Sequence, residues 1–240
     1  GVGWFLNIGS IERSPKKGID YTTNNFIVNK GGNTTELEAR NGNYYGEKIE
    51  KEFIKYIYLG EQVGWEAYHK SGNVYHYGTT SDARISRSIY GTDVAKWFLE
   101  TIEDPNGNTI EYSYFKDAKG QVYLDDIQYN FDGNQYINTI DLTYESRPDD
   151  IESLRTHSEV ITAQRLKRIK VYSTEHDIWA YDLDYVQATG TGRSLLSSVI
   201  KKGFSGQAET VFSTIDLDWQ MTSGAYFGDL NDNNDDLHDW

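Results

Sequence analysis

The chain has 240 residues, a formal net charge of −14 and no cysteine. The lack of Cys excludes disulfides, thiolate metal sites and Cys nucleophiles. The acidic balance argues against nucleic acid and anionic membrane surfaces as partners, because both need clustered Lys and Arg, which only residues 165–170 begin to offer. No run of 18 apolar residues and no signal peptide is found, so this segment is not expected to insert into a membrane.

The first third of the sequence predicts short strands separated by turns. Strands are expected around residues 4–6, 10–13 and 25–28. Residues 44–59 have apolar side chains spaced four apart, as on a helix, but their Tyr and Ile content favours a strand. Residues 65–77 predict a hairpin whose two arms meet across a glycine-containing turn.

The clearest hairpin lies at residues 97–114, where two runs of β-forming residues flank the sequence DPNGN. The proline of this sequence favours a turn, and its Asn-Gly pair tolerates the positive φ that tight hairpins need. Ile110, Tyr112 and Tyr114 are expected on one face of the second run, because side chains alternate along a strand.

The second half of the sequence continues the same pattern. The expected strand pairs are residues 123–129 with 137–144 and 165–172 with 179–185. Two further strands are expected at residues 195–201 and 211–219. Arg147-Pro148-Asp149-Asp150 is expected to interrupt the sheet. Residues 81–88 are expected to form a loop, and residues 92–96 are expected to form the one short helix.

Strands at short spacing with turn residues between them indicate an all-β protein. We expect an extended antiparallel sheet of successive β-hairpins with at most one short helix. No exact internal repeat is found, only a recurring hairpin pattern.

Pairs of carboxylates recur along the predicted strands. They are Asp125 with Asp126, Asp182 with Asp184, and Asp216 with Asp218. A glycosidase needs two carboxylates at a defined separation, and residues i and i+2 of a strand share a face. In a chain with 37 acidic residues, the simpler interpretation is a solvated strand face whose charges protect sheet edges.

Other catalytic patterns are weak. Glu-x-Glu occurs at residues 36–38 and 50–52, as in ADP-ribosyltransferases, but the accompanying Arg and Ser-Thr-Ser motifs are not visible. His69 and His76 lie on opposite arms of one predicted hairpin without a third metal ligand at a suitable spacing. The nucleophile-elbow, P-loop and Rossmann patterns are missing from the sequence.

The acidic stretch at residues 227–240 is a candidate calcium site, because oxygen side chains at alternating positions of a loop can converge on Ca²⁺. The candidate ligands are Asn231, Asn233, Asp235 and Asp239. Two neutral Asn ligands and no glycine at the turn predict weak binding. The alternative is a plain acidic terminus, and no other cofactor is expected.

Several motifs, taken in order, resemble the SpvB-like domain, which begins insecticidal toxin-complex B components and many RHS/YD-repeat toxins. Residues 3–13 (GWFLNIGSIER) resemble its Gly-Trp-x-Leu-x-x-Pro-x-Ile-x-Arg start, with Gly9 in place of Pro. Further matches lie at residues 97–114, 147–149, 165–169, 181–185 and 194–199.

The sequence FGDLN at residues 227–231 resembles the first FG-GAP/VCBS-type repeat that follows this domain in the family. The resemblance therefore divides the chain into a β-rich shell domain at residues 1–220 and the start of such a repeat at residues 221–240.

The resemblance implies a structural role rather than catalysis. In this family, RHS-type hairpins form a hollow shell that encloses a toxic C-terminal polypeptide, and the FG-GAP repeats form a propeller that docks the pore-forming A component. The expected partners are other segments of the same parent chain, the A component and the RHS C component. The sequence is expected to be a fragment of a secreted parent, which is cytoplasmic before export.

Two alternatives stay open. One is a calcium-assisted carbohydrate-binding or adhesion module, whose exposed Tyr and Trp side chains would stack on sugar rings. The other is a glycosidase that uses one of the Asp pairs.

Overall fold

The computed structural model describes residues 6, 8–88, 91–154, 156, 159–174, 176–206 and 208–220. These residues form strands and connecting turns, and among them is no helix that could cross a membrane. The strands are β1 (Ser10–Arg13), β2 (Phe26–Lys30), β3 (Asn33–Asn41), β4 (Tyr44–Glu47), β5 (Lys55–Gly60), β6 (Gly64–Tyr68), β7 (Val74–Tyr77), β8 (Arg84–Ser86), β9 (Val94–Glu103), β10 (Thr109–Lys116), β11 (Val122–Phe131), β12 (Tyr136–Ser153), β13 (Val160–Ser173), β14 (Asp177–Gln187), β15 (Ser194–Ser205) and β16 (Ala208–Asp216).

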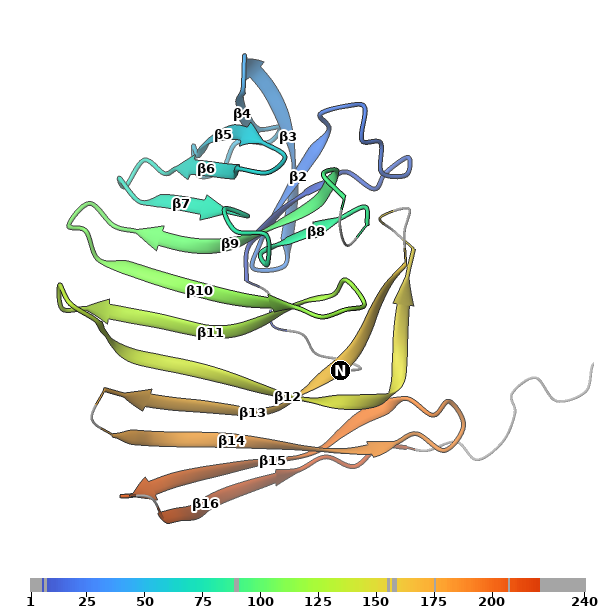
Figure 1. Ribbon diagram of the computed structural model, residues 1–240, viewed down its shortest axis with the longest axis vertical. Coiled ribbons are helices and arrows are strands. Elements are labelled where there is room, and N and C mark those ends of the chain that lie inside the picture. Colours follow the sequence, from blue (N-terminus) through green and yellow to red (C-terminus); the bar gives the residue numbers. More distant parts are fainter. Residues whose placement is uncertain are drawn as a thin grey trace, which may run out of the picture.

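The N-terminal half forms a closed ring of strands, seen in the upper part of Figure 1. Strands β1 to β7 pair antiparallel in sequence order, and β7 pairs with β9. Strand β1 also pairs with β9, through Ser10, Ile11 and Glu12, so that the row of strands returns to its start. The ring therefore has no free edge along β1, which an open sheet would expose.

Strand β9 belongs to both the ring and the sheet that follows it. Its first half pairs with β1 and β8, and its second half pairs with β7 and β10. The backbone amides of Phe98 and Leu99 point to opposite edges, because they donate to the carbonyls of Ala83 and Gly9. The ring and the sheet are thus joined by continuous backbone pairing.

Aromatic side chains fill the ring. Trp65, Trp97 and Phe26 are almost completely buried, and the ring centroids of Phe26 and Trp65 lie 4.7 Å apart in an edge-to-face arrangement. Gly78 has a φ of 61°, and a Cβ atom there would collide with the Trp97 indole. These aromatic side chains are therefore closely packed in the core of the ring of strands and are not exposed for stacking on a ligand.

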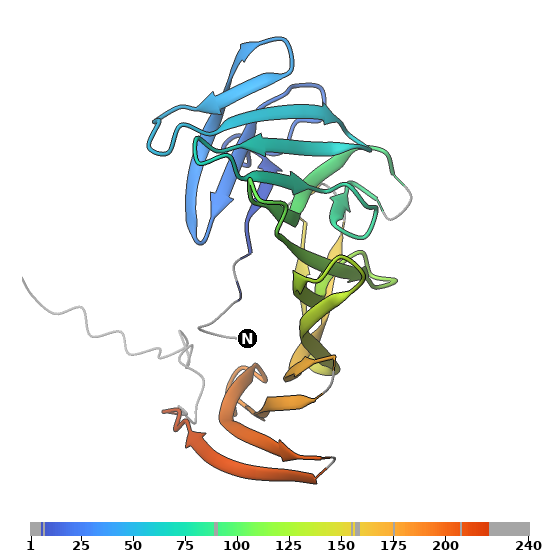
Figure 2. The same cartoon turned by 90° about the vertical axis from the view of Figure 1, so that its left-hand side faces the viewer.

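Strands β10 to β16 continue from β9 as an open sheet in which every strand pairs with its neighbour in sequence. Figure 2 shows that this sheet curls, since β14 to β16 turn toward the side on which β1 enters the ring. Ile8 packs against the apolar clusters of both the ring and the sheet. The expected extended antiparallel sheet of hairpins is therefore confirmed, and the closed ring is a feature that the sequence did not predict.

The expected hairpins are confirmed. Residues 65–68 pair with β7, and Thr109 pairs with Glu103 across the DPNGN turn, whose amides are held by the Asp104 carboxylate. The two strand pairs expected in the second half also form, and the two further strands expected there, β15 and β16, pair with each other. Tyr112 and Tyr114 both pack on the apolar cluster of the sheet, whereas Ile110 is exposed.

Several local predictions were wrong. Residues 92–96 do not form a helix, because β9 begins at Val94 and is paired on both edges. The expected single strand at residues 44–59 is divided into β4 and β5, and the expected loop at residues 81–88 contains β8. In each case tertiary strand pairing outweighs local sequence preference.

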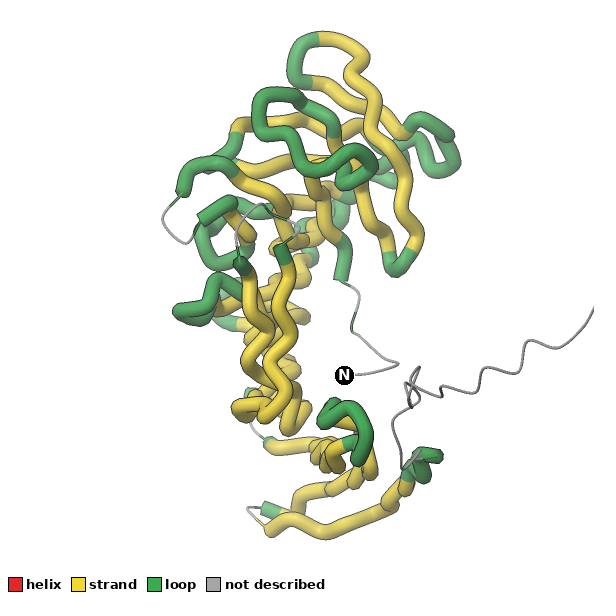
Figure 3. The backbone as a smooth tube through the Cα atoms, turned by 90° about the vertical axis from the view of Figure 1, so that its right-hand side faces the viewer, coloured by secondary structure: helices red, strands yellow, loops and turns green. Residues whose placement is uncertain are grey.

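The expected break at residues 147–150 was also wrong, because β12 runs through it. The pairing of β12 with β13 shifts register between Ser146 and Ile151, so the strand bends instead of ending. Figure 3 shows the ends of these two strands as an arm that reaches toward the ring. The Tyr21 hydroxyl of the ring donates to the Thr156 carbonyl at 2.8 Å, which ties the arm to the ring.

A buried ion pair holds the bend. The Arg147 guanidinium donates to both carboxylate oxygens of Asp149, which also accept from the Ser194 amide and hydroxyl on β15. Burial would raise the pKa of Asp149, but the hydrogen bonds from Arg147 and Ser194 outweigh it and hold the pKa below its usual value. Asp149 is thus ionised in the folded protein, and both of its carboxylate oxygens accept hydrogen bonds.

We expect Trp97→Ala to lower the free energy of unfolding by about 4 kcal/mol, because it opens a cavity in the closed ring. Trp179→Ala is the control, since that side chain is 41% exposed on the open sheet. It should cost about 1 kcal/mol or less. Urea unfolding followed by circular dichroism measures both, and equal losses would contradict the assigned core.

We expect Asp149→Asn to destabilise the protein by about 3 kcal/mol at pH 7, because it leaves Arg147 buried without its counter-ion. The folded pKa of Asp149 is depressed, so its contribution is complete above the unfolded value near 4 and is lost as the pH falls below it. The difference from wild type should therefore shrink in urea unfolding at low pH. Asp150→Asn, at an exposed pair with Lys119, should change little, and a pH-independent difference would refute the assignment.

Candidate functional site

The two faces of the open sheet differ in chemistry. On one face, ion pairs link β13, β14, β15 and β16: Asp182 pairs with Arg168 at 3.4 Å and with Lys202 at 2.6 Å, and Lys202 also pairs with Glu209 at 3.1 Å. Because side chains alternate along β14, Leu183 points to the other face, where it joins an apolar cluster.

The apolar face is built from one repeated unit. In each unit, two apolar or aromatic residues spaced i and i+2 on one strand lie opposite a Leu-x-x-Ile or Leu-x-x-Val sequence on the next strand. The pairs are Tyr75/Tyr77 with Ile102/Leu99, Tyr112/Tyr114 with Ile127/Leu124, Leu142/Tyr144 with Ile169/Leu166, and Leu183/Tyr185 with Val199/Leu196. In each unit the register shifts between the two pairs. Two residues therefore separate Leu from Ile or Val on one strand, whereas a single residue separates their two partners on the other strand.

A hydrogen bond joins each unit to the one before it. The hydroxyl of Tyr114 donates to the Leu99 carbonyl at 2.5 Å. Tyr144 donates to Leu124 at 2.7 Å, and Tyr185 donates to Leu166 at 2.6 Å. The tyrosine hydroxyl of one unit thus bonds to a backbone carbonyl of the preceding unit.

Sequence reasoning missed this unit, although the signal was present. The sequence Asp-Leu-x-Tyr occurs at residues 141–144 and 182–185, and Asp-Leu-Asp-Trp follows at residues 216–219. The repeat is spread over hairpins with connections of unequal length, so it has no fixed period. Two of the carboxylate pairs proposed as glycosidase candidates belong to this motif.

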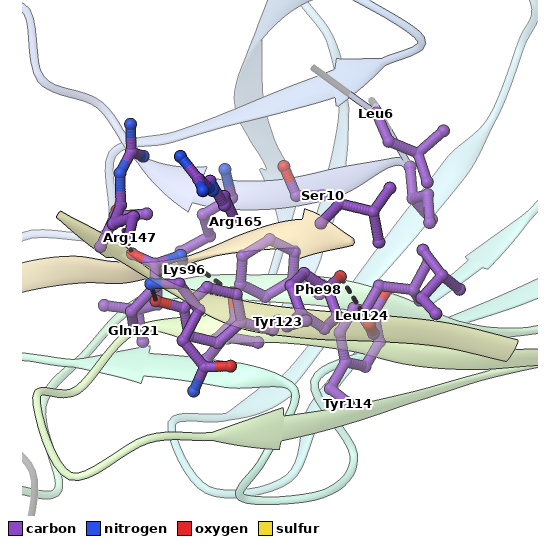
Figure 4. A pocket seen from close by; sticks show the side chains of 18 of the residues that line it. Leu6, Ser10, Lys96, Phe98, Tyr114, Gln121, Tyr123, Leu124, Arg147 and Arg165 are labelled. Carbon is purple, nitrogen blue, oxygen red and sulfur yellow. Dashed lines mark hydrogen bonds between the residues drawn. The ribbon is translucent and has the colours of Figure 1, made fainter. Parts of the chain in front are cut away.

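A cavity of about 510 Å³ lies where the ring meets the open sheet. In Figure 4, Leu6 and Leu124 lie toward one end of it, and Arg147 and Arg165 lie toward the other. The Arg165 guanidinium is held by Glu145 at 2.7 Å and by the Ser194 hydroxyl at 2.9 Å. The cavity therefore has an apolar end and a cationic end whose charges are already paired.

The tyrosines around the cavity are not poised for acid–base chemistry. Burial raises the pKa of Tyr123 to about 12, and the Tyr123 hydroxyl accepts from the amides of Ala163 and Gln164. Burial likewise raises the pKa of Tyr144 well above its usual value. Their hydroxyls act as structural donors and acceptors between strands.

Of the carboxylate pairs that were candidates for catalysis, Asp182 and Asp184 on β14 are engaged in ion pairs. Asp184 accepts from Lys167 and from the Ser198 hydroxyl, both at 3.2 Å. Asp126 lies opposite Asp141, and Asp216 lies at the end of β16, so the three proposed pairs are on different strands. Partial burial and the neighbouring Asp126 and Asp141 carboxylates raise the pKa of Asp125.

The other candidates are also separated from one another. Glu36 is paired with Lys16 and Lys48, whose hydrogen bonds lower its pKa to about 2. His69 lies in a turn beside Ser71, whereas His76 lies opposite Glu66, so the two histidines do not face each other. Across the described ranges, no group of three or more His, Asp or Glu side chains is arranged to hold a metal ion.

The proposed calcium ligands Asn231, Asn233, Asp235 and Asp239 lie outside the described residues, as does the FGDLN sequence. The same holds for the start of the opening motif, at residues 1–5 and 7. The calcium site and the domain boundary at residue 220 stay predictions.

Comparison with solved structures gives fold neighbours. The fold matches "TcdB2-TccC3-Cdc42" with a TM-score of 0.78 and 17% identity, covering 92% of this chain and 14% of that chain. It matches the Photorhabdus luminescens Tc holotoxin pore (TM-score 0.73, 18% identity) over 91% of this chain and 14% of that one. It also matches the N-terminal domain of effector protein SpvB from Salmonella typhimurium strain LT2 (TM-score 0.69, 15% identity) over 92% and 89%.

The chain thus spans about one-seventh of the toxin-complex chains that it matches, and most of the SpvB N-terminal domain. Comparison with curated protein sequences gave no match. The model of the family described as "Salmonella virulence plasmid 65kDa B protein" matches residues 1–164, which is more than half of the sequence. The chain therefore belongs to the SpvB family.

Proposed function

We propose that this chain is a non-catalytic structural segment of a secreted toxin-complex or RHS-type protein. Its strands contribute to a hollow β-shell that encloses a toxic C-terminal polypeptide of the parent. The observation that carries this proposal is the contrast between the two ends of the sheet, one of which is closed and the other open.

The open end is strand β16. It pairs with β15 on one edge, no strand of the described chain lies on its other edge, and all nine of its residues are exposed. Phe212 is 72% exposed, Ile215 61% and Val211 57%. A long apolar edge strand in water would pair with another chain and aggregate. A neighbouring strand in a larger protein would remove that liability.

The family and the fold neighbours support this role. Toxin-complex chains contain the same fold as about one-seventh of their length, which is what a segment of a larger assembly would give. On this basis we propose as partners other segments of the same parent chain, a pore-forming A component and an RHS C component. The parent is proposed to be secreted after synthesis in the cytoplasm.

The non-catalytic assignment is supported by the engagement of the polar groups. Asp182, Asp184 and Glu36 are engaged in ion pairs. The tyrosine hydroxyls around the cavity bond to backbone groups of neighbouring strands. A carbohydrate-binding module would need aromatic faces and polar groups that are free for a sugar. The tyrosines of the repeated units are instead part of the sheet packing.

We expect the isolated chain to self-associate through β16 and the double variant Val211→Lys/Ile215→Lys to stay monomeric, because like charges on an edge prevent pairing. Light scattering at increasing protein concentration measures the effect. The matched control is Ile49→Lys/Val63→Lys, which places the same charges on residues 67% and 53% exposed in the ring half. A wild-type chain that stays monomeric, or a control that also prevents association, would refute the proposal.

We further propose that residues 221–240 begin an FG-GAP/VCBS-type repeat that binds Ca²⁺ weakly through Asn231, Asn233, Asp235 and Asp239. Calorimetric titration with Ca²⁺ should then give heat for the wild-type chain and none for Asp235→Asn/Asp239→Asn, because carboxylates supply the charge for the ion. Asp132→Asn, in the turn after β11, is the control that should keep the heat. If the wild-type chain gives no heat, residues 221–240 do not bind Ca²⁺ and the calcium proposal is refuted.

A further inference from the structure

The residues that directly follow β16 form the first half of another repeated unit. Leu217 and Trp219 have the same i and i+2 spacing as Leu183 and Tyr185, and both pairs follow an aspartate in the same Asp-Leu-Asp-aromatic sequence. The Trp219 indole N–H donates to the Leu196 carbonyl at 2.7 Å. This is the bond that Tyr185 makes to Leu166 one unit earlier.

The backbone around Trp219 supports the same equivalence. Asp216 lies opposite Ser198, and the Leu217 amide donates to the carbonyl of Ser197, the residue at which β15 shifts register against β14. Trp219 therefore stands where Tyr114, Tyr144 and Tyr185 stand in their units, beside the leucine of the preceding strand.

The second half of this unit is missing from the described chain. In the four complete units, the partner strand carries Leu opposite the i+2 aromatic residue and Ile or Val opposite the i residue. Leu217 and Trp219 are each 37% exposed, and no strand of the described chain lies beside them on the outer edge of β16. In residues 221–240, neither Leu230 nor Leu237 is followed by Ile or Val three residues later.

We propose that the outer edge of β16 is a docking site for an antiparallel strand that carries a Leu-x-x-Ile or Leu-x-x-Val sequence, with its Leu opposite Trp219 and its Ile or Val opposite Leu217. The strand comes from another part of the parent polypeptide. This inference rests on the proposed function and deepens it, because it says which strand the open edge selects. Main-chain pairing supplies general affinity, and the apolar side chains supply selectivity.

A labelled synthetic peptide that copies residues 193–204 serves as the probe, because it contains Leu196 and Val199 in the required spacing. Fluorescence anisotropy is measured at a chain concentration where light scattering shows a monomer. We expect the peptide to bind and its Leu196→Asp version to bind at least ~10-fold more weakly, since burying a leucine side chain is worth that much.

Three variants of the chain locate the binding. Trp219→Ala should weaken the native peptide at least ~10-fold by the same argument. Val211→Lys/Ile215→Lys should abolish binding of both peptides, and Trp179→Ala, on the apolar face of β14, should leave it unchanged. Binding that survives Val211→Lys/Ile215→Lys would place the peptide elsewhere and overturn the proposal.

The remaining outcomes separate this inference from the proposed function. If both peptides bind equally and the charged edge variant abolishes both, the edge accepts strands without selecting leucine, so the inference fails and the shell segment stands. If neither peptide binds to the monomeric chain, the edge is closed to strands, and both proposals fail.

Discussion

Backbone pairing along β9 is the constraint on which the rest of the structure depends. This one strand is paired on both edges over most of its length, by β1 and β10 on one edge and by β7 and β8 on the other. Its first half closes the ring, and its second half starts the open sheet. A strand shared in this way fixes the sheet to a rigid base, because neither part can move without breaking main-chain hydrogen bonds.

The repeated unit curves the sheet that extends from β9. Each register shift places an extra residue in one strand, which increases the local twist and bends the sheet in one direction. The tyrosine hydroxyl of the next unit donates to a backbone carbonyl of the unit before it, so that successive units are joined.

Much of the fold could be predicted from the sequence, because hairpin formation is local. The DPNGN turn and the alternating strands specify their own pairing, as the Asp104 carboxylate bonds to the turn amides show. Ring closure by Ser10, Ile11 and Glu12 could not be predicted, because it joins residues more than 80 positions apart through backbone groups that carry no sequence signal. The helix expected at residues 92–96 failed for the same reason.

The bend at Arg147 and the carboxylate pairs show a second limit. A Pro-Asp-Asp sequence is typical of the end of a strand. Here the buried hydrogen bond from Ser194 to Asp149 holds it as a bend within a continuous strand. Asp182 and Asp184 have the spacing of catalytic carboxylates, and only the structure shows that they form ion pairs with Lys202 and Lys167 on neighbouring strands. The repeated Asp-Leu-x-aromatic motif, to which these carboxylates belong, is visible in the sequence when a repeat of unequal spacing is looked for.

The central claim is that the outer edge of β16 is completed by another strand of the parent protein. Hydrogen–deuterium exchange of the β16 amides tests it most directly when the 240-residue chain, with the Val211→Lys/Ile215→Lys changes to keep it monomeric, and the intact parent protein are compared. We expect amides at residues 208–216 to exchange fast at the outer edge in the short chain and to be strongly protected in the parent, whereas β9 is protected in both. Equally fast exchange of β16 in the parent would contradict it.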